Sequence, residues 1–143
     1  MSPEPIPHAL LLAPLPPDAA PGGPVALAAL LLTGWLNAPS QATVRLTPTS
    51  RAFLASSPPD EPTRLAVARA ACLRVVALMA EADVATLRLV APHLRMMADA
   101  WEPRGDRHAL NLCATAGMCL AALGEGEEAR GYLARAGLLE AAL

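Results

Sequence analysis

Small residues recur at regular intervals along residues 112–136, and this spacing limits what the chain can form more than any other feature. The pattern reads Cys113-x2-Ala116-Gly117-x2-Leu120-x3-Gly124-x4-Ala129-x3-Leu133-x2-Ala136. We expect two antiparallel helices to pass closely here, because Ala116 and Gly117 leave room for a neighbouring backbone and Ala129 offers a matching small surface. Leu120 and Leu133 would then fill the space where the two helices diverge.

The composition also favours helices. Hydrophobic residues make up 54% of the chain and aromatic residues only 3%, so the core must be built from Ala, Leu and Val. Ala and Leu are strong helix formers. With 143 residues, the chain is long enough for one ordinary domain with a core of its own. The sequence therefore predicts an all-α fold.

Charge and cysteine content exclude several classes of protein. The net charge is −2 and the eleven basic residues are spread along the chain, which argues against nucleic-acid binding. All eleven are arginine, as expected of a GC-rich bacterial genome. Three cysteines cannot form a complete disulfide framework, so we expect a cytoplasmic protein. A membrane location is disfavoured, because no apolar run reaches the roughly 20 residues that a spanning helix needs.

Proline marks the first boundary along the chain. Residues 1–23 are dense in proline and end in a Gly-Gly pair, so they predict an irregular arm. Residues 24–143 then form a single helical domain. Pro24 is suited to open a helix over residues 24–37. That helix is apolar on all sides, so another part of the chain or a second subunit must cover it.

A less regular segment connects this helix to the second half. Val44 and Leu46 alternate with threonines, which could form a short strand. Thr49 or Ser50 could cap a brief helix that runs to Leu54. The prolines that follow mark the boundary of the helical core.

The second half predicts two helical hairpins, over residues 63–101 and 107–137. In the first hairpin, a helix to Ala80 is followed by one that Asp83 opens and Pro92 kinks. The apolar stripe of this second helix is Leu87, Val90, Ala91, Leu94, Met97, Ala98 and Trp101. Residues 102–106 are a loop by composition. In the second hairpin, helices of residues 107–123 and 127–136 are expected, with Gly137 as a cap or break.

The two hairpins align with each other when the chain is shifted by 44 residues. Small residues then meet small ones, and branched apolar residues meet leucine: Cys72 with Ala116, Val76 with Leu120, Ala80 with Gly124, Ala85 with Ala129, and Leu89 with Leu133. This pattern resembles a degenerate tetratricopeptide repeat, a helix–turn–helix unit of 34 residues, over about residues 63–141. The chain departs from it at Cys113, Leu120, Leu133 and Ala141, where the family has tryptophan, tyrosine, another aromatic residue and proline, and Leu73 replaces a glycine. An Ala-rich bundle with accidental spacing stays open as an alternative.

The resemblance implies a groove formed by the first helix of each hairpin. Its partner-binding residues would be Arg74, Leu78, Asn111, Met118 and Ala122, within the wider set Val67, Ala70, Ala77, Ala114 and Ala121. Such a groove is mostly apolar, with Arg74 and Asn111 as polar contacts. It implies a non-catalytic adaptor that binds an apolar peptide or helix of a protein partner.

Two alternatives to a partner-binding groove stay open. Helix 24–37 could cover the same surface, or the apolar helices could form the subunit interface of a homo-oligomeric assembly protein, such as a homodimer. An enzyme is the least favoured class. His93, His108 and Cys113 could be imagined as a metal or nucleophile site, but no CxxC, HExxH or paired-carboxylate motif accompanies them. We therefore expect no catalytic residues, no metal and no cofactor.

Overall fold

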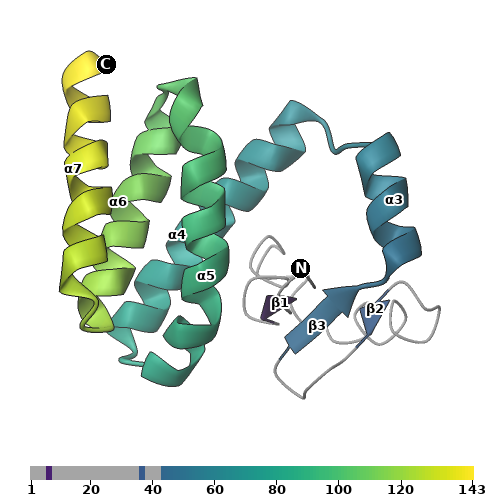
Figure 1. The fold of residues 1–143 in the computed structure, drawn as a ribbon, viewed down its shortest axis with the longest axis horizontal. Helices are drawn as coiled ribbons and strands as arrows, with labels where there is room; N and C mark the ends of the chain where they lie inside the picture. Colours follow the sequence, from purple (N-terminus) through teal and green to yellow (C-terminus); the bar gives the residue numbers. More distant parts are fainter. Residues whose placement is uncertain (1–5, 8–35, 38–42) are drawn as a thin grey trace.

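Helices dominate the part of the chain that the computed structural model describes, which is residues 6–7, 36–37 and 43–143. The α-helices are α3 (Pro48–Ser56), α4 (Glu61–Ala80), α5 (Val84–Trp101), α6 (Arg107–Ala122) and α7 (Gly126–Ala142). A short 3-10 turn, η2 (Glu102–Arg104), follows α5. Helices α4 to α7 lie side by side, α7 forms one outer edge, and α3 lies on the opposite side with the strands (Figure 1). The all-α prediction is confirmed.

The only strands in the described residues form a small sheet of β1 (Ile6–Pro7), β2 (Leu36–Asn37) and β3 (Thr43–Leu46). β3 lies in the middle and is antiparallel to both neighbours. The strand expected around Val44 and Leu46 is therefore present. β1 also packs against α5 and so links the sheet to the helices.

The predicted N-terminal features fall almost wholly outside the described residues. The arm over residues 1–23 contributes only β1 to the description, and the apolar helix over 24–37 contributes only its last two positions. Those two positions, Leu36 and Asn37, are in strand β2 and pair with Leu46 and Arg45. The expected helix therefore does not reach Asn37, because a neighbouring strand takes up the backbone hydrogen bonds there.

Side-chain caps fix where four of the helices begin. Their N-cap residues are Thr47, Asp60, Asp83 and Asp106. Each side-chain oxygen accepts a backbone N–H that the first helical turn leaves without a partner. For α3, the predicted cap at Thr49 or Ser50 is wrong: Thr47 accepts the N–H of Ser50, and Pro48 is the first helical residue. A proline suits that position because its missing N–H is not needed there.

Two predicted interruptions do not end their helices. α5 runs through Pro92 without a break. α7 continues past Gly137 to Ala142, so the expected break there is wrong. A helical glycine costs about 1 kcal/mol relative to alanine. Contacts of Ala136 and Leu139 with the core, on either side of Gly137, hold the helix together.

The core repeats itself along the chain, although not with the predicted shift of 44. In α4 the buried positions are Ala68, Ala71, Val75 and Leu78, and the positions 41 residues further on, Ala109, Leu112, Ala116 and Cys119, are among the buried positions of α6. In the second helices, the buried positions Leu87, Val90 and Leu94 correspond to Ala129, Tyr132 and Ala136, each 42 residues further on. The two hairpins thus place equivalent faces in one continuous core.

The closest helix approach lies between α6 and α7, as the small-residue pattern predicts. A Cβ on Gly117 would lie 2.6 Å from Cγ of Leu133 and 3.1 Å from the carbonyl oxygen of Ala129. Leu133 therefore packs directly onto Gly117 instead of filling a diverging space. The absence of a side chain at Gly117 is what allows α7 to seat there.

A polar cluster also holds α7 against α5. The hydroxyl of Tyr132 donates a hydrogen bond to Asp99 (3.0 Å). The guanidinium of Arg135 donates to Asp99 (2.9 Å) and Glu102 (2.7 Å), and lies 4.0 Å from the centre of the Tyr132 ring. Burial, together with the Asp99 carboxylate, raises the pKa of Tyr132. The phenol therefore stays protonated and can donate its hydrogen bond at neutral pH.

Candidate functional site: the groove between α4 and α6

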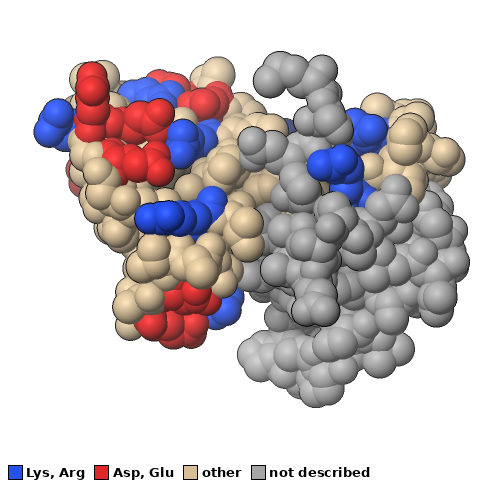
Figure 2. Space-filling view, turned by 60° about the horizontal axis from the view of Figure 1, so that its bottom comes forward, with Lys and Arg blue, Asp and Glu red and all other residues tan. Residues whose placement is uncertain are grey.

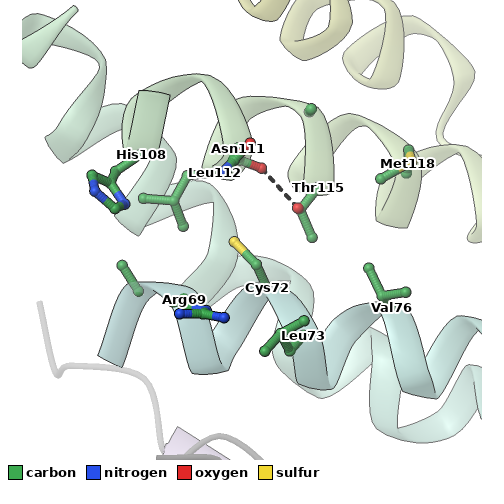
Figure 3. A pocket seen from close by; sticks show the side chains of 11 residues that line it. Arg69, Cys72, Leu73, Val76, His108, Asn111, Leu112, Thr115 and Met118 are labelled. Carbon is green, nitrogen blue, oxygen red and sulfur yellow. Dashed lines mark hydrogen bonds between the residues drawn. The ribbon is translucent and has the colours of Figure 1, made fainter. Parts of the chain in front are cut away.

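The first helices of the two hairpins, α4 and α6, lie next to each other with a groove between them (Figure 3). α4 and α6 run in the same direction, because Arg69 lies near His108 at one end and Val76 lies near Met118 at the other. The groove has a volume of about 470 Å³. Its lining comprises Ala68, Arg69, Cys72, Leu73 and Val76 of α4, and His108, Asn111, Leu112, Ala114, Thr115 and Met118 of α6.

The groove is apolar along most of its length. Ala68 and Leu112 form buried parts of its floor. Leu73 is 61% exposed and Met118 is 43% exposed, and they stand on opposite sides of it. The hydroxyl of Thr115 donates to the backbone carbonyl of Asn111 (2.7 Å), so its hydrogen is already used. Large apolar side chains in contact with water on two facing helices are typical of a surface that another apolar segment covers.

Two of the predicted partner-binding residues line this groove. Asn111 and Met118 are both exposed and both belong to its α6 side. Ala114, from the wider predicted set, lies there too. The prediction that the groove would come from the first helix of each hairpin therefore agrees with the geometry.

The other three predicted residues do not line it. Leu78 has 0% exposure and belongs to the core, so its assignment as a partner contact is wrong. Arg74 forms an ion pair with Glu81, the C-cap residue that follows α4 (3.5 Å). Ala122 is exposed at the last position of α6, beyond the groove.

The predicted rotation of α4 about its own axis was wrong, which explains why its groove-lining residues were not predicted. The α4 residues that line the groove include Arg69, Cys72, Leu73 and Val76, which follow the three- and four-residue spacing of one helical face. A shift of one residue turns a side chain by about 100° around the helix. With the burial period of 41 residues in place of 44, the predicted α6 residues Asn111, Ala114 and Met118 correspond to Ala70, Leu73 and Ala77, and of these only Leu73 lines the groove.

Trp101 contacts His108, which lines one end of the groove. Its ring is buried and lies 4.5 Å from the guanidinium of Arg104 and 5.8 Å from that of Arg64. His108 meets the Trp101 ring edge-on, with centroids 6.3 Å apart. Arg104 also forms an ion pair with Glu61 at the start of α4 (2.6 Å). These contacts tie the beginning of α4, the end of α5 and the beginning of α6 together.

Cys72 is the one groove residue with thiol chemistry. Burial raises the pKa of the Cys72 thiol. Cys113 and Cys119 have no exposed surface at all, and burial raises the pKa of both. A buried thiol with a raised pKa is a poor nucleophile.

The native protein should therefore react with a maleimide at Cys72 first, while Cys113 and Cys119 react only after unfolding. Because the pKa of Cys72 is raised, the labelling rate should still be climbing at pH values where an ordinary thiol has reached its plateau. Peptide mapping by mass spectrometry locates the label, and Cys72→Ser is the control that should leave the folded protein unlabelled. Equal labelling of all three cysteines would contradict the packing of α6.

The described residues have no grouped metal ligands, and the face in Figure 2 has mixed charge. In that part of the chain, no three His, Cys, Asp or Glu side chains are grouped so that they could hold a metal ion. His93 is buried on α5, His108 lies in the groove and Cys113 lies in the core. The face shown in Figure 2 carries acidic and basic side chains in mixed groups. Within the described ranges, no helix combines the length and apolar character that crossing a membrane requires.

Comparison with known proteins found no relative of the chain. Neither a protein family, nor a curated protein, nor a solved structure was found to match the chain.

Proposed function

We propose that the chain is a protein-interaction module that binds an apolar peptide or helix in the groove between α4 and α6. The observation that carries this proposal is the pair of facing apolar edges, with Leu73 and Val76 on one side and Met118 on the other. The parallel arrangement of the two first helices supports a tetratricopeptide-like mode of binding.

The dimensions of the groove suit a short helical segment. From His108 to Met118 the α6 side runs for ten residues, or about 15 Å at 1.5 Å per residue. An occupying helix of about three turns would cover that length. Apolar side chains on one face of such a helix would remove Leu73, Val76 and Met118 from water, which is the main source of affinity in helix-in-groove recognition.

Met118→Glu should weaken binding of a groove peptide about tenfold or more, because it places a carboxylate in contact with an apolar ligand. The probe is a 12-residue peptide selected from a random displayed library against the native protein, then measured by fluorescence polarisation. Met96→Glu is the matched control, since Met96 is 62% exposed on α5 and lies outside the groove. That variant should bind as the native protein does.

The proposed function fails if the selection yields no peptide, or if every selected peptide binds the native protein and Met118→Glu equally well. Circular dichroism of both variants should match the native spectrum, because the two methionines are at least 43% exposed. A loss of binding in Met96→Glu as well would place the binding surface on α5 instead.

Self-assembly is a second candidate, and exposed leucine on the outer helix favours it. Leu138 of α7 is 74% exposed and does not line the groove, and α7 forms one outer edge of the helices (Figure 1). A second copy could cover that face and create a homo-oligomer. Sedimentation equilibrium separates the two functions, because the groove function operates in a monomer and the assembly function requires a larger species.

A further inference from the structure

Arg69 gives the groove one cationic site in an otherwise apolar lining. It projects from α4, is exposed, and has no ion pair or hydrogen bond with any described residue. No acidic residue belongs to the groove lining. Of the lining side chains, Arg69 is therefore the one that carries a permanent charge with no counter-charge beside it.

Carboxylates close to the groove are already paired with other arginines. At one end, Glu61 and Asp106 both contact Arg104, at 2.6 and 2.8 Å. Toward the other end, Glu81 contacts Arg74 at 3.5 Å. Arg69 is thus left without an intramolecular carboxylate among the described residues, although the whole chain has a net charge of −2.

The charge lies toward one end of the groove. Arg69 is on the His108 side, while Val76 and Met118 form the opposite, fully apolar end (Figure 3). Seven residues separate Arg69 from Val76 along α4, which corresponds to about 10 Å or two helical turns. The groove therefore has one charged end and one apolar end. A bound segment with the complementary pattern fits in only one orientation.

We propose that the groove selects an amphipathic helix that carries an aspartate or glutamate about two turns away from its deepest apolar anchor. This inference rests on the proposed function and names the chemistry of its partner. The carboxylate would pair with the guanidinium of Arg69, in a bidentate geometry that arginine is suited to form. The anchor would contact Val76 and Met118. A ligand with lysine or arginine at the same position would be repelled, so the charge gives orientation and specificity more than affinity.

The test compares peptides selected from a random 12-residue library against three proteins: native, Arg69→Glu and Arg88→Glu. Arg88 is the matched control, because it is exposed on α5, has no ion pair among the described residues and lies outside the groove. Against the native protein and Arg88→Glu, selected peptides should be enriched in Asp or Glu at one position, two turns from an apolar residue. Against Arg69→Glu, that position should change to Lys or Arg.

Affinity of a single acidic peptide gives a second measurement. Arg69→Glu should weaken its binding about three- to tenfold, which is the range expected when an exposed ion pair is replaced by a like-charge contact. Arg69→Gln should fall between the native protein and the charge reversal. Replacing the peptide's carboxylate with lysine should restore binding to Arg69→Glu and to no other variant.

Two failures of this test have different meanings. In the first, selected peptides lose binding in Met118→Glu, but they show no charge preference and bind Arg69→Glu as well as they bind the native protein. The inference about the acidic partner is then wrong, and the groove function stands. If no selected peptide is sensitive to Met118→Glu, the groove function itself fails and this inference falls with it. A change of preference in Arg88→Glu would assign the charge effect to α5 and overturn the role of Arg69.

Discussion

Gly117→Val should lower the free energy of unfolding by about 1–3 kcal/mol, the range seen when a packed contact is overfilled. A Cβ at this position would approach Leu133 to 2.6 Å and the backbone oxygen of Ala129 to 3.1 Å. The side chain of Leu133 can move, but the Ala129 carbonyl belongs to the backbone of α7. We therefore expect α7 to be pushed away from α6. Urea denaturation followed by circular dichroism measures the loss.

Gly131→Val is the matched control for this prediction. Gly131 is also a helical glycine, but a Cβ added there meets nothing within 4 Å. Its stability should stay within about 0.5 kcal/mol of the native protein, as for most surface changes. Leu133→Ala, combined with Gly117→Val, should recover part of the lost stability by removing the nearest atoms. Equal losses at Gly117 and Gly131 would contradict the close packing at Gly117, because valine has a higher helix propensity than glycine and a side chain at Gly131 meets no neighbour.

Leu78→Ala should cost about 2–5 kcal/mol in the free energy of unfolding, as deletion of a buried leucine side chain usually does. Leu78 has 0% exposure and packs within the cluster that α4 shares with its neighbours. The removed side chain leaves a cavity that rigid helices can only partly close. This result would show that Leu78 is a core residue and not the partner contact that the tetratricopeptide resemblance implied.

Leu138→Ala provides the comparison for Leu78→Ala, because the same side chain is removed from a position that is 74% exposed. Its effect on unfolding should stay within about 0.5 kcal/mol. Both variants are measured by the shift of the urea midpoint at an unchanged slope. A small loss at Leu78 would mean that the described core does not depend on α4.

Local signals allowed the helices of the second half to be predicted from sequence. Asp83 was predicted to open its helix and does cap it, and the starts expected at residues 63, 83 and 107 lie within about two residues of those of α4, α5 and α6. The contact of Gly117 with α7 was also readable, because a glycine among small residues has few other uses in a helix.

Long-range pairing could not be read in the same way. β1 and β2 have only two residues each, and they form strands because β3 lies between them. No periodicity can show in a segment that short. Leu36 and Asn37 were therefore assigned to the end of a helix, although tertiary context decided otherwise.

Of the predicted partner-binding residues, Asn111 and Met118 of α6 line the groove, whereas Ala122 of α6 and Arg74 and Leu78 of α4 do not. Asn111 and Met118 follow from a helix whose register the small-residue pattern fixes. α4 has apolar residues on nearly every face, so no polar side indicated how the helix is turned, and Leu78 was placed outside when it lies inside. Arg69 was missed because it is one of three arginines on α4, and nothing in the sequence distinguishes it from an ordinary solvent contact.

The contacts around Trp101 have a further consequence for what the groove can accept. Arg104, Glu61 and His108 join three helix ends at one end of the groove. At the other end, beside Val76 and Met118, no ion pair of the described residues connects α4 to α6. Apolar packing holds that end instead, since Leu78 of α4 and Cys119 of α6 are buried in the same core. Because apolar packing is less directional than ion pairs, that end should accept ligand anchors of different bulk more readily than the Trp101 end.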